Sequence, residues 1–64
     1  MALTEVTSLL RGLRDGAEFF VTDCDDVHRL LAPSLGKQGY FDVRNETTYK
    51  VLVLSGDTVV SPVQ

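Results

Sequence analysis

The densest group of chemically reactive side chains lies in the segment 23–28, DCDDVH. In a helix, Cys24 and His28 are four residues apart and share one face. This spacing suits two metal ligands, or a thiol nucleophile and its base. Asp23, Cys24, Asp26 and His28 are therefore the candidates for a metal-dependent role. The chain has one cysteine and one histidine, so it offers no second pair of such ligands.

A purely structural explanation of the same segment requires no ligand. Asp23 is a typical N-cap residue, and Asp25 and Asp26 follow in the first turn, where exposed N–H groups and the helix dipole stabilise carboxylates. A calcium loop also requires a glycine and a distal glutamate, which this segment lacks. We therefore predict a helix start with no metal and no cofactor. We also predict no catalytic residue and no enzymatic activity, because so short a chain has little room for a substrate cleft.

A second group of candidates combines one aromatic ring with several cations: Lys37, Tyr40, Arg44 and Lys50. Such a surface can stack bases and neutralise phosphates of a single-stranded nucleic acid. The net charge of −3 disfavours this partner. The segment 36–39 also lacks the full pattern of a phosphate-binding loop and precedes a strand, not a helix. The structural alternative is a solvated sheet face with a cross-strand ion pair.

The second group belongs to a predicted β-hairpin. Residues 40–44 alternate in polarity, residues 49–54 form the most apolar run, and the turn formers 45–48 separate them. We favour the register in which Asp42 faces Lys50, because it pairs opposite charges and separates the apolar set best. This register places Phe41, Val43, Tyr49, Val51 and Val53 on one face. It places Tyr40, Asp42, Arg44, Lys50, Leu52 and Leu54 on the other.

The second of these faces is the predicted binding surface for a protein partner. Exposed apolar residues beside an edge strand are typical of protein contacts, and short helices reach Leu52 and Leu54 poorly. The predicted partner-binding residues are Tyr40, Arg44, Lys50, Leu52 and Leu54. The alternative is that the C-terminal pair Val59-Val60 covers the two leucines.

The remaining segments predict two helices and a third strand. Apolar residues at helical spacing predict a helix over 4–14, with Thr4 as its N-cap and Glu5 in its first turn, followed by a left-handed Gly16. The members of this stripe are Val6, Leu9, Leu10 and Leu13. A second stripe, Val27, Leu30, Leu31 and Leu35, predicts a helix from Asp23 that Pro33 kinks or ends. Between them, residues 18–22 predict a strand.

The predicted order is α-β-α-β-β in a single domain, residues 1–64. It indicates an α+β fold in which two helices pack on one face of a mainly antiparallel, three-stranded sheet. The tail 58–63 has β-propensity, and two alternatives stay open for it. It can form a fourth strand against 49–54, with Pro62 confining it to an edge, or it can be a loose end.

Length and composition bound the remaining possibilities. A domain of 64 residues buries only roughly 60% of its unfolded surface, and one cysteine allows no internal disulfide. We therefore expect self-association as a homodimer, which enlarges a small core. The N-terminus does not have the pattern of a secretory signal, and no apolar run approaches the ~20 residues of a membrane span. These features, with the free thiol, predict a cytoplasmic protein without a membrane partner.

The chain resembles a group of very short α/β proteins encoded by phages and prophages. The resemblance rests on GAEFFV at 16–21, GYFDVR at 39–44 and YKV at 49–51, which are similar to the family's G-E-S-F-F-V strand and F-x-x-R…Y-R-V hairpin. It implies an accessory protein of a phage or mobile element. We therefore predict a small binding or regulatory protein that docks on a host or phage protein, or on itself. Weak binding of single-stranded nucleic acid is the alternative.

Overall fold

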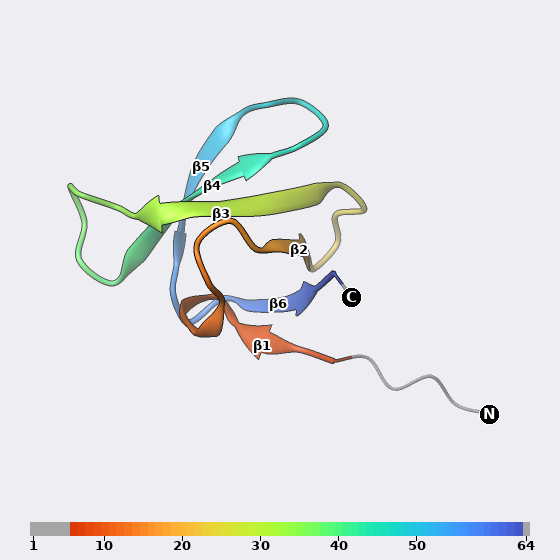
Figure 1. Cartoon of the computed structure of the whole chain (residues 1–64), viewed down its shortest axis with the longest axis horizontal. Coiled ribbons are helices and arrows are strands. Elements are labelled where there is room, and N and C mark those ends of the chain that lie inside the picture. The colour runs from red at the N-terminus through yellow and green to blue at the C-terminus, as the bar shows by residue number, and fades with distance from the viewer. Residues whose placement is uncertain (1–5, 64) are drawn as a thin grey trace.

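The structure is a computed structural model in which residues 6–63 are described, and its regular secondary structure is almost entirely β-strand (Figure 1). The strands form one antiparallel sheet in the order β1-β6-β2-β3-β4-β5. The elements are β1 (Ser8–Leu9), η1 (Leu10–Gly12), β2 (Glu18–Val21), β3 (Val27–Pro33), β4 (Tyr40–Asn45), β5 (Val51–Ser55) and β6 (Val59–Pro62). The predicted α+β fold with two packed helices is therefore wrong, because the only helical element described is the single 3-10 turn η1.

The first predicted helix is replaced by β1 and η1. Its start, Thr4 and Glu5, lies outside the described residues. Ser8 and Leu9 pair with β6, and the N–H of Leu10 donates to the carbonyl oxygen of Thr58 over 2.9 Å. One short turn then brings Leu10 into the core, where it is fully buried. The segment that was predicted to form several helical turns thus forms one. Hydrogen bonds from its backbone to β6 and to Thr58 take the place of hydrogen bonds within a helix.

The second predicted helix is replaced by the longest strand, β3. It lies between β2 and β4, so ladder bonds are available on both sides. His28 and Leu30 alternate toward the core, and a register shift between Leu30 and Ala32 interrupts the alternation. Because of this bulge, the apolar residues of β3 do not follow strict strand alternation, and their spacing resembles that of a helix. Leu35, expected on the apolar helix face, is fully exposed in the connection after β3.

The predicted strand over 18–22 and both strands of the hairpin are present as β2, β4 and β5. The tail also forms a strand, β6, but it pairs with β1 and β2 and not with β5. Val63 N–H donates to the carbonyl oxygen of Glu18 over 3.0 Å, so the preceding Pro62 directs its nitrogen away from β2. Because β1 pairs only with Val59 and Val60, the missing N–H of Pro62 costs no ladder bond.

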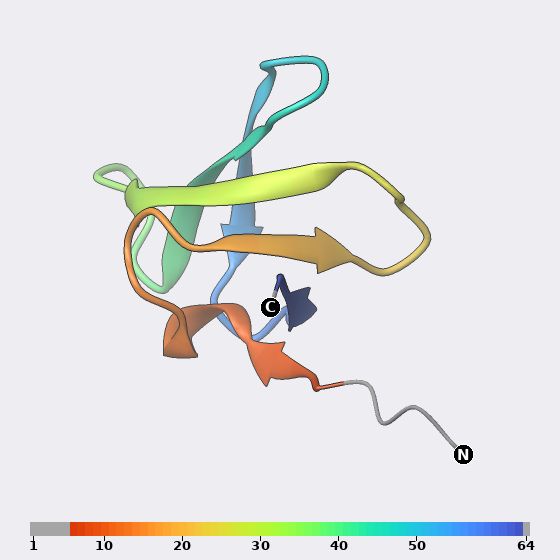
Figure 2. The ribbon, with the colours of Figure 1, turned by 45° about the vertical axis from the view of Figure 1, so that its right-hand side comes forward.

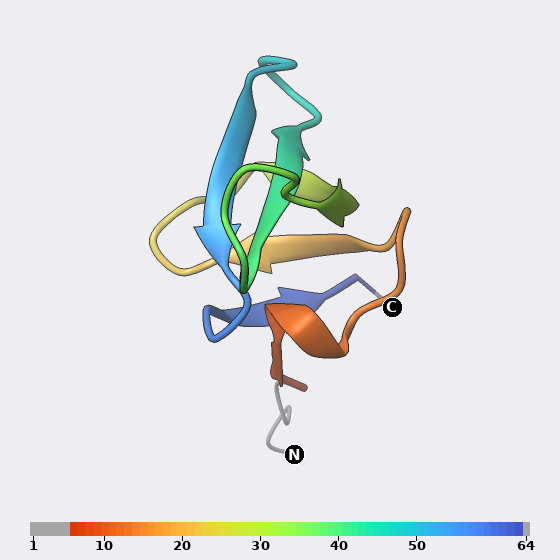
Figure 3. The same cartoon turned by 90° about the vertical axis from the view of Figure 1, so that its left-hand side faces the viewer.

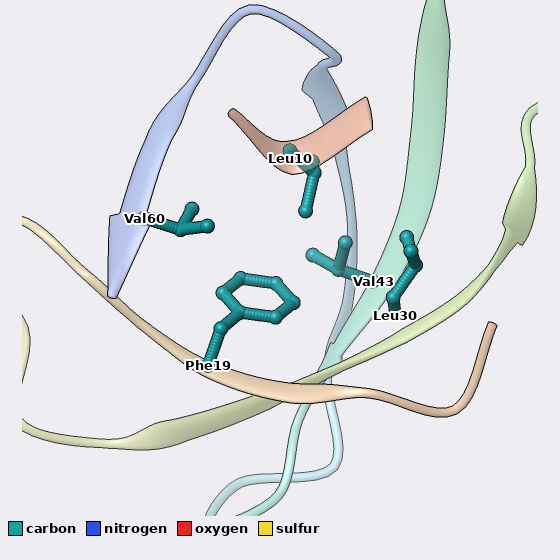
Figure 4. Close-up of a cluster of buried hydrophobic side chains, with 5 residues drawn as sticks. All are labelled: Leu10, Phe19, Leu30, Val43 and Val60. Carbon is teal, nitrogen blue, oxygen red and sulfur yellow. The ribbon is translucent and has the colours of Figure 1, made fainter. Parts of the chain in front are cut away.

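The sheet curls, so that β1, β6 and η1 lie across from β4 and β5 (Figures 2 and 3). Five fully buried side chains point toward one another inside this curl (Figure 4). They are Leu10, Phe19, Leu30, Val43 and Val60. Each comes from a different element, and Leu13, Val21, Phe41 and Leu54 pack around them. The core therefore ties η1 to four strands, but it is small.

Candidate interaction surface

The register of the β4–β5 hairpin decides which side chains share a surface. β4 and β5 pair Asp42 with Val53, Val43 with Leu52, and Arg44 with Val51. The predicted pairing of Asp42 with Lys50 is therefore wrong, and so is the predicted division of the hairpin into two faces. The connection between the last ladder pair, Arg44 and Val51, is residues 45–50. It has an even number of residues, whereas the predicted register requires an odd number.

The turn residues explain this register. The Asn45 side-chain oxygen accepts hydrogen bonds from the backbone N–H groups of Thr47 and Thr48, over 2.8 Å and 3.1 Å. The N–H of Tyr49 donates to the carbonyl oxygen of Asn45 over 2.7 Å, and Tyr49 has a left-handed φ of 62°. An asparagine side chain that closes its own turn thus fixes the register more strongly than the charge pairing across the strands.

The corrected register moves two of the predicted partner-binding residues off the outer face. Leu52 and Leu54 lie on the core side with Val43, and Leu54 packs against the core. Val51 and Val53, which were not predicted as site residues, instead share the outer face with Tyr40, Asp42 and Arg44. Their exposed fractions are 57% and 50%. The signal for them was the unbroken run VLVL, which leaves apolar residues on both faces of one strand.

β5 is the last strand of the sheet and is flanked by β4 alone (Figure 3). The N–H of Asn45 donates to Lys50 and that of Gly56 to Gly39, each over 2.9 Å. Residues alternate in an antiparallel ladder, so the backbone groups of Val51 and Val53 point away from β4. Within residues 6–63, these two residues form no backbone hydrogen bond outside the β4 ladder.

This edge lacks the features that usually protect an exposed strand. The strand Val51–Ser55 contains no charged residue, no proline and no bulge. Its apolar surface continues with Tyr49 and Leu52, which are 71% and 43% exposed. We call Tyr49, Val51, Leu52 and Val53 the β5 edge. An exposed apolar edge of this kind is a template for pairing with another strand.

Arg44 of the predicted site forms an ion pair with a carboxylate of the same chain. Its Nε donates to Oε2 of Glu46 over 2.8 Å, and Arg29 donates from Nε to Oε1 of Glu46 over 2.5 Å. Arg29 also donates to Glu18 over 3.3 Å. The hydrogen bond from Arg44, followed by that from Arg29, lowers the pKa of Glu46 to about 2. The same bonds raise the pKa of both arginines. This network crosses β2, β3 and β4 on the outer face.

The residues of the predicted nucleic-acid site fall into separate groups. Lys37 Nζ lies 4.1 Å from the centre of the Tyr40 ring, a cation–π contact. The guanidinium carbon of Arg44 lies 6.0 Å from the centre of the Tyr49 ring. Lys50 is exposed at the end of the turn before β5. The aromatic rings are thus paired with cations of the same chain.

The acidic segment 23–28 spans the β2–β3 connection and the start of β3, not a helix. His28 is 3% exposed and stacks on Phe19, with 5.9 Å between ring centres. Its Nδ1 lies 3.0 Å from the carbonyl oxygen of Asp26. The predicted shared helical face of Cys24 and His28 therefore does not exist. Over the described range 6–63, no three His, Cys, Asp or Glu side chains form a group that could hold a metal.

A pocket of about 410 Å³ lies beside this connection. Phe20 and Ser61 line one part of it, and Asp23, Cys24 and Asp25 line another. His28 points into the core and is not among its lining residues, so Cys24 has no histidine base there. The pocket is thus lined by an apolar ring, a thiol, hydroxyl groups and two carboxylates.

The structure gives no helix in residues 6–63 that is long and apolar enough to cross a membrane. Comparisons with protein-family models, with curated proteins and with solved structures found no match for this chain. A proposal for its function therefore rests on the surface of the molecule itself.

Proposed function

We propose that this protein is a small, non-enzymatic binding protein that contacts other protein chains through the β5 edge. One observation carries the proposal. Val51 and Val53 direct N–H and C=O groups outward from a strand that is half exposed and apolar on both faces. A partner strand can add to such an edge, where its backbone supplies hydrogen bonds and its alternate side chains supply specificity.

The outer face beside the edge supports the same mode of binding. Tyr40, Asp42 and Arg44 lie in β4 next to Val51 and Val53. Together they form an apolar strip with a polar margin, the composition of a protein interface. Of the predicted partner-binding residues, the proposal keeps Tyr40, Arg44 and Leu52, and it retains Lys50 only as the residue next to the edge. Tyr49, Val51 and Val53 are added, and Leu54 is removed because it packs against the core.

Binding of single-stranded nucleic acid is the weaker candidate. Arg44 is paired with Glu46, and Lys37 lies over the Tyr40 ring. With a net charge of −3, the chain attracts phosphates poorly at long range. Lys50 is left as the one exposed cation of the predicted set without a described ionic or aromatic contact. A single cation gives little affinity for a polyanion.

The assignment to a phage or mobile-element accessory protein, acting in the cytoplasm, is also part of this proposal. It is supported by the resemblance of the segments 16–21, 39–44 and 49–51 to short phage proteins. The free thiol of Cys24 is compatible with a reducing compartment.

A photo-crosslinking amino acid at Val53 tests the proposed function in cells. The matched control carries the same amino acid at Val59, which is 53% exposed but lies on β6. We expect covalent protein adducts from position 53 and few from position 59, with the adduct identified by mass spectrometry. Equal yields from the two positions, or no adduct from position 53, would overturn the proposal.

A further inference from the structure

We infer that the strand bound at the β5 edge is β5 of a second copy of this chain. The two strands would pair antiparallel about a two-fold axis that passes through Leu52. This inference rests on the proposed function and names the partner of the same edge.

The backbone geometry selects the pairing. Residues whose N–H and C=O point outward must form the hydrogen-bonded pairs of a new antiparallel ladder. An axis at Leu52 places Val51 of one copy opposite Val53 of the other. Each such pair exchanges two N–H···O bonds, and the axis produces the pair twice. The two Leu52 residues then form a non-hydrogen-bonded pair, with Cα atoms ~4.5 Å apart and side chains in contact on the core side.

The ends of the strand locate the axis. The carbonyl oxygen of Ser55 already accepts the N–H of Thr58 over 3.0 Å. At the other end, Tyr49 leaves the extended conformation with its φ of 62°. The unpaired stretch is therefore 51–53, and its centre is Leu52.

The pairing places apolar residues opposite one another and keeps the two lysines apart. Valines face valines, and Lys50 of one copy lies opposite Leu54 of the other. The two Lys50 side chains are four ladder positions apart, about 13 Å at ~3.3 Å per residue. The two lysines therefore do not face each other. Repulsion between like charges, which prevents many exposed strands from pairing with themselves, is absent from this pairing.

The size of the core favours a second copy. Within residues 6–63, each chain buries five hydrophobic side chains fully. Pairing of β5 covers part of Val51, Leu52 and Val53 and extends one sheet across both copies. At the opposite margin, β1 pairs along only two residues. The β5 contact thus uses the long free edge of the described sheet, and a two-fold contact closes on itself without forming a fibre.

Sedimentation of the full chain from micromolar to millimolar concentration tests the inference. We expect a monomer–dimer equilibrium that Val51→Lys and Val53→Lys each weaken by roughly tenfold or more, because each variant replaces a valine that faces a valine and brings two lysines close together across the axis. Val59→Lys, at a valine of similar exposure, is the matched control and should leave the equilibrium unchanged. Urea denaturation of each variant shows that it remains folded. A wild-type chain that stays monomeric throughout, or lysine variants that dimerise like wild type, would overturn the inference.

A disulfide trap tests the axis. In a Cys24→Ser background, Leu52→Cys should form a covalent dimer under oxidised glutathione, because Cα atoms ~4.5 Å apart suit a disulfide. Val59→Cys in the same background should remain monomeric. A trap that forms equally at both positions contradicts the axis at Leu52.

The two proposals fail in different ways. A chain that is monomeric at all concentrations but forms crosslinks from Val53 to another protein disproves the homodimer and leaves the binding function standing. A monomeric chain without any such crosslink disproves both.

Discussion

Arg44 donates a hydrogen bond from Nε to Oε2 of Glu46 over 2.8 Å. The same carboxylate accepts a bond from Arg29, so Glu46 joins β3 to the turn that follows β4. These charge-assisted bonds favour the ionised carboxylate and lower the pKa of Glu46 from 4.5 to about 2. Glu46 thus helps to hold the base of the hairpin that carries the β5 edge.

This relationship predicts a pH-dependent stability. The folded-state pKa lies below 4.5, so the contribution of Glu46 to the free energy of unfolding is complete above that pH and declines as the pH falls toward about 2. Glu46→Gln should therefore lower the urea midpoint at pH 7, and its difference from wild type should narrow below pH 4.5. A difference that stays constant with pH would contradict the prediction.

Adjacent phenylalanines should differ sharply in their effect on stability. Phe19 is fully buried and stacks on His28, whereas Phe20 points outward and is 36% exposed. Phe19→Ala should cost about 3–5 kcal/mol, because it removes a buried ring and leaves a cavity. That loss approaches the whole stability of a domain of this size. Phe20→Ala should remain folded. Thermal denaturation followed by circular dichroism measures both, and similar losses in the two variants would disprove this orientation of β2.

Gly56 should not tolerate a side chain. A Cβ at this position would lie 2.9 Å from Cε1 of Phe41 and 3.1 Å from Cβ of Arg11. Gly56→Ala should destabilise the protein by about 1–3 kcal/mol, because the Phe41 ring and then η1 must move away from the β5–β6 turn. Gly36→Ala meets no atom within 4 Å and should change stability by less than about 1 kcal/mol. Urea denaturation compares them, and equal effects would argue against the close approach of Phe41 and η1 to Gly56.

The direction of the backbone groups in β5 can be tested with proline. The N–H of Leu52 points toward Val43, so Leu52→Pro should cost about 1–3 kcal/mol through a broken ladder bond. The N–H of Val53 points outward, so Val53→Pro should be better tolerated in the fold while preventing strand addition at the edge. Denaturation curves of the two variants provide the comparison. A larger loss of stability for Val53→Pro would show that the N–H of Val53, and not that of Leu52, points toward β4.

The candidate site could be predicted only in part. Tyr40 and Arg44 were placed correctly on one face, because polar and apolar residues alternate in β4. The pattern in 51–54 has no alternation, so it did not determine which residues of β5 face outward. The outward residues of β5 are instead set by the turn, through the side-chain hydrogen bonds of Asn45 and the left-handed conformation of Tyr49. The ion pair of Arg44 with Glu46, which also binds Arg29 of β3, could not be predicted either, because strand alternation does not specify contacts between side chains of different strands.

The sequence by itself determined the strands at 18–21, 40–44 and 51–54 and the left-handed glycine at position 16. These are local properties: residues 40–44 alternate in polarity, residues 18–21 and 51–54 are rich in aromatic or β-branched side chains, and turn residues separate the strands. Only the tertiary structure decided that the leucine-rich segments around Leu10 and Leu30 become a single turn and a central strand. Their apolar spacing fits a helix as well as a bulged strand, and pairing with distant strands selects between them. The free edge of β5 was likewise decided by the fold, because β6 pairs with β1 and β2 and leaves β5 uncovered.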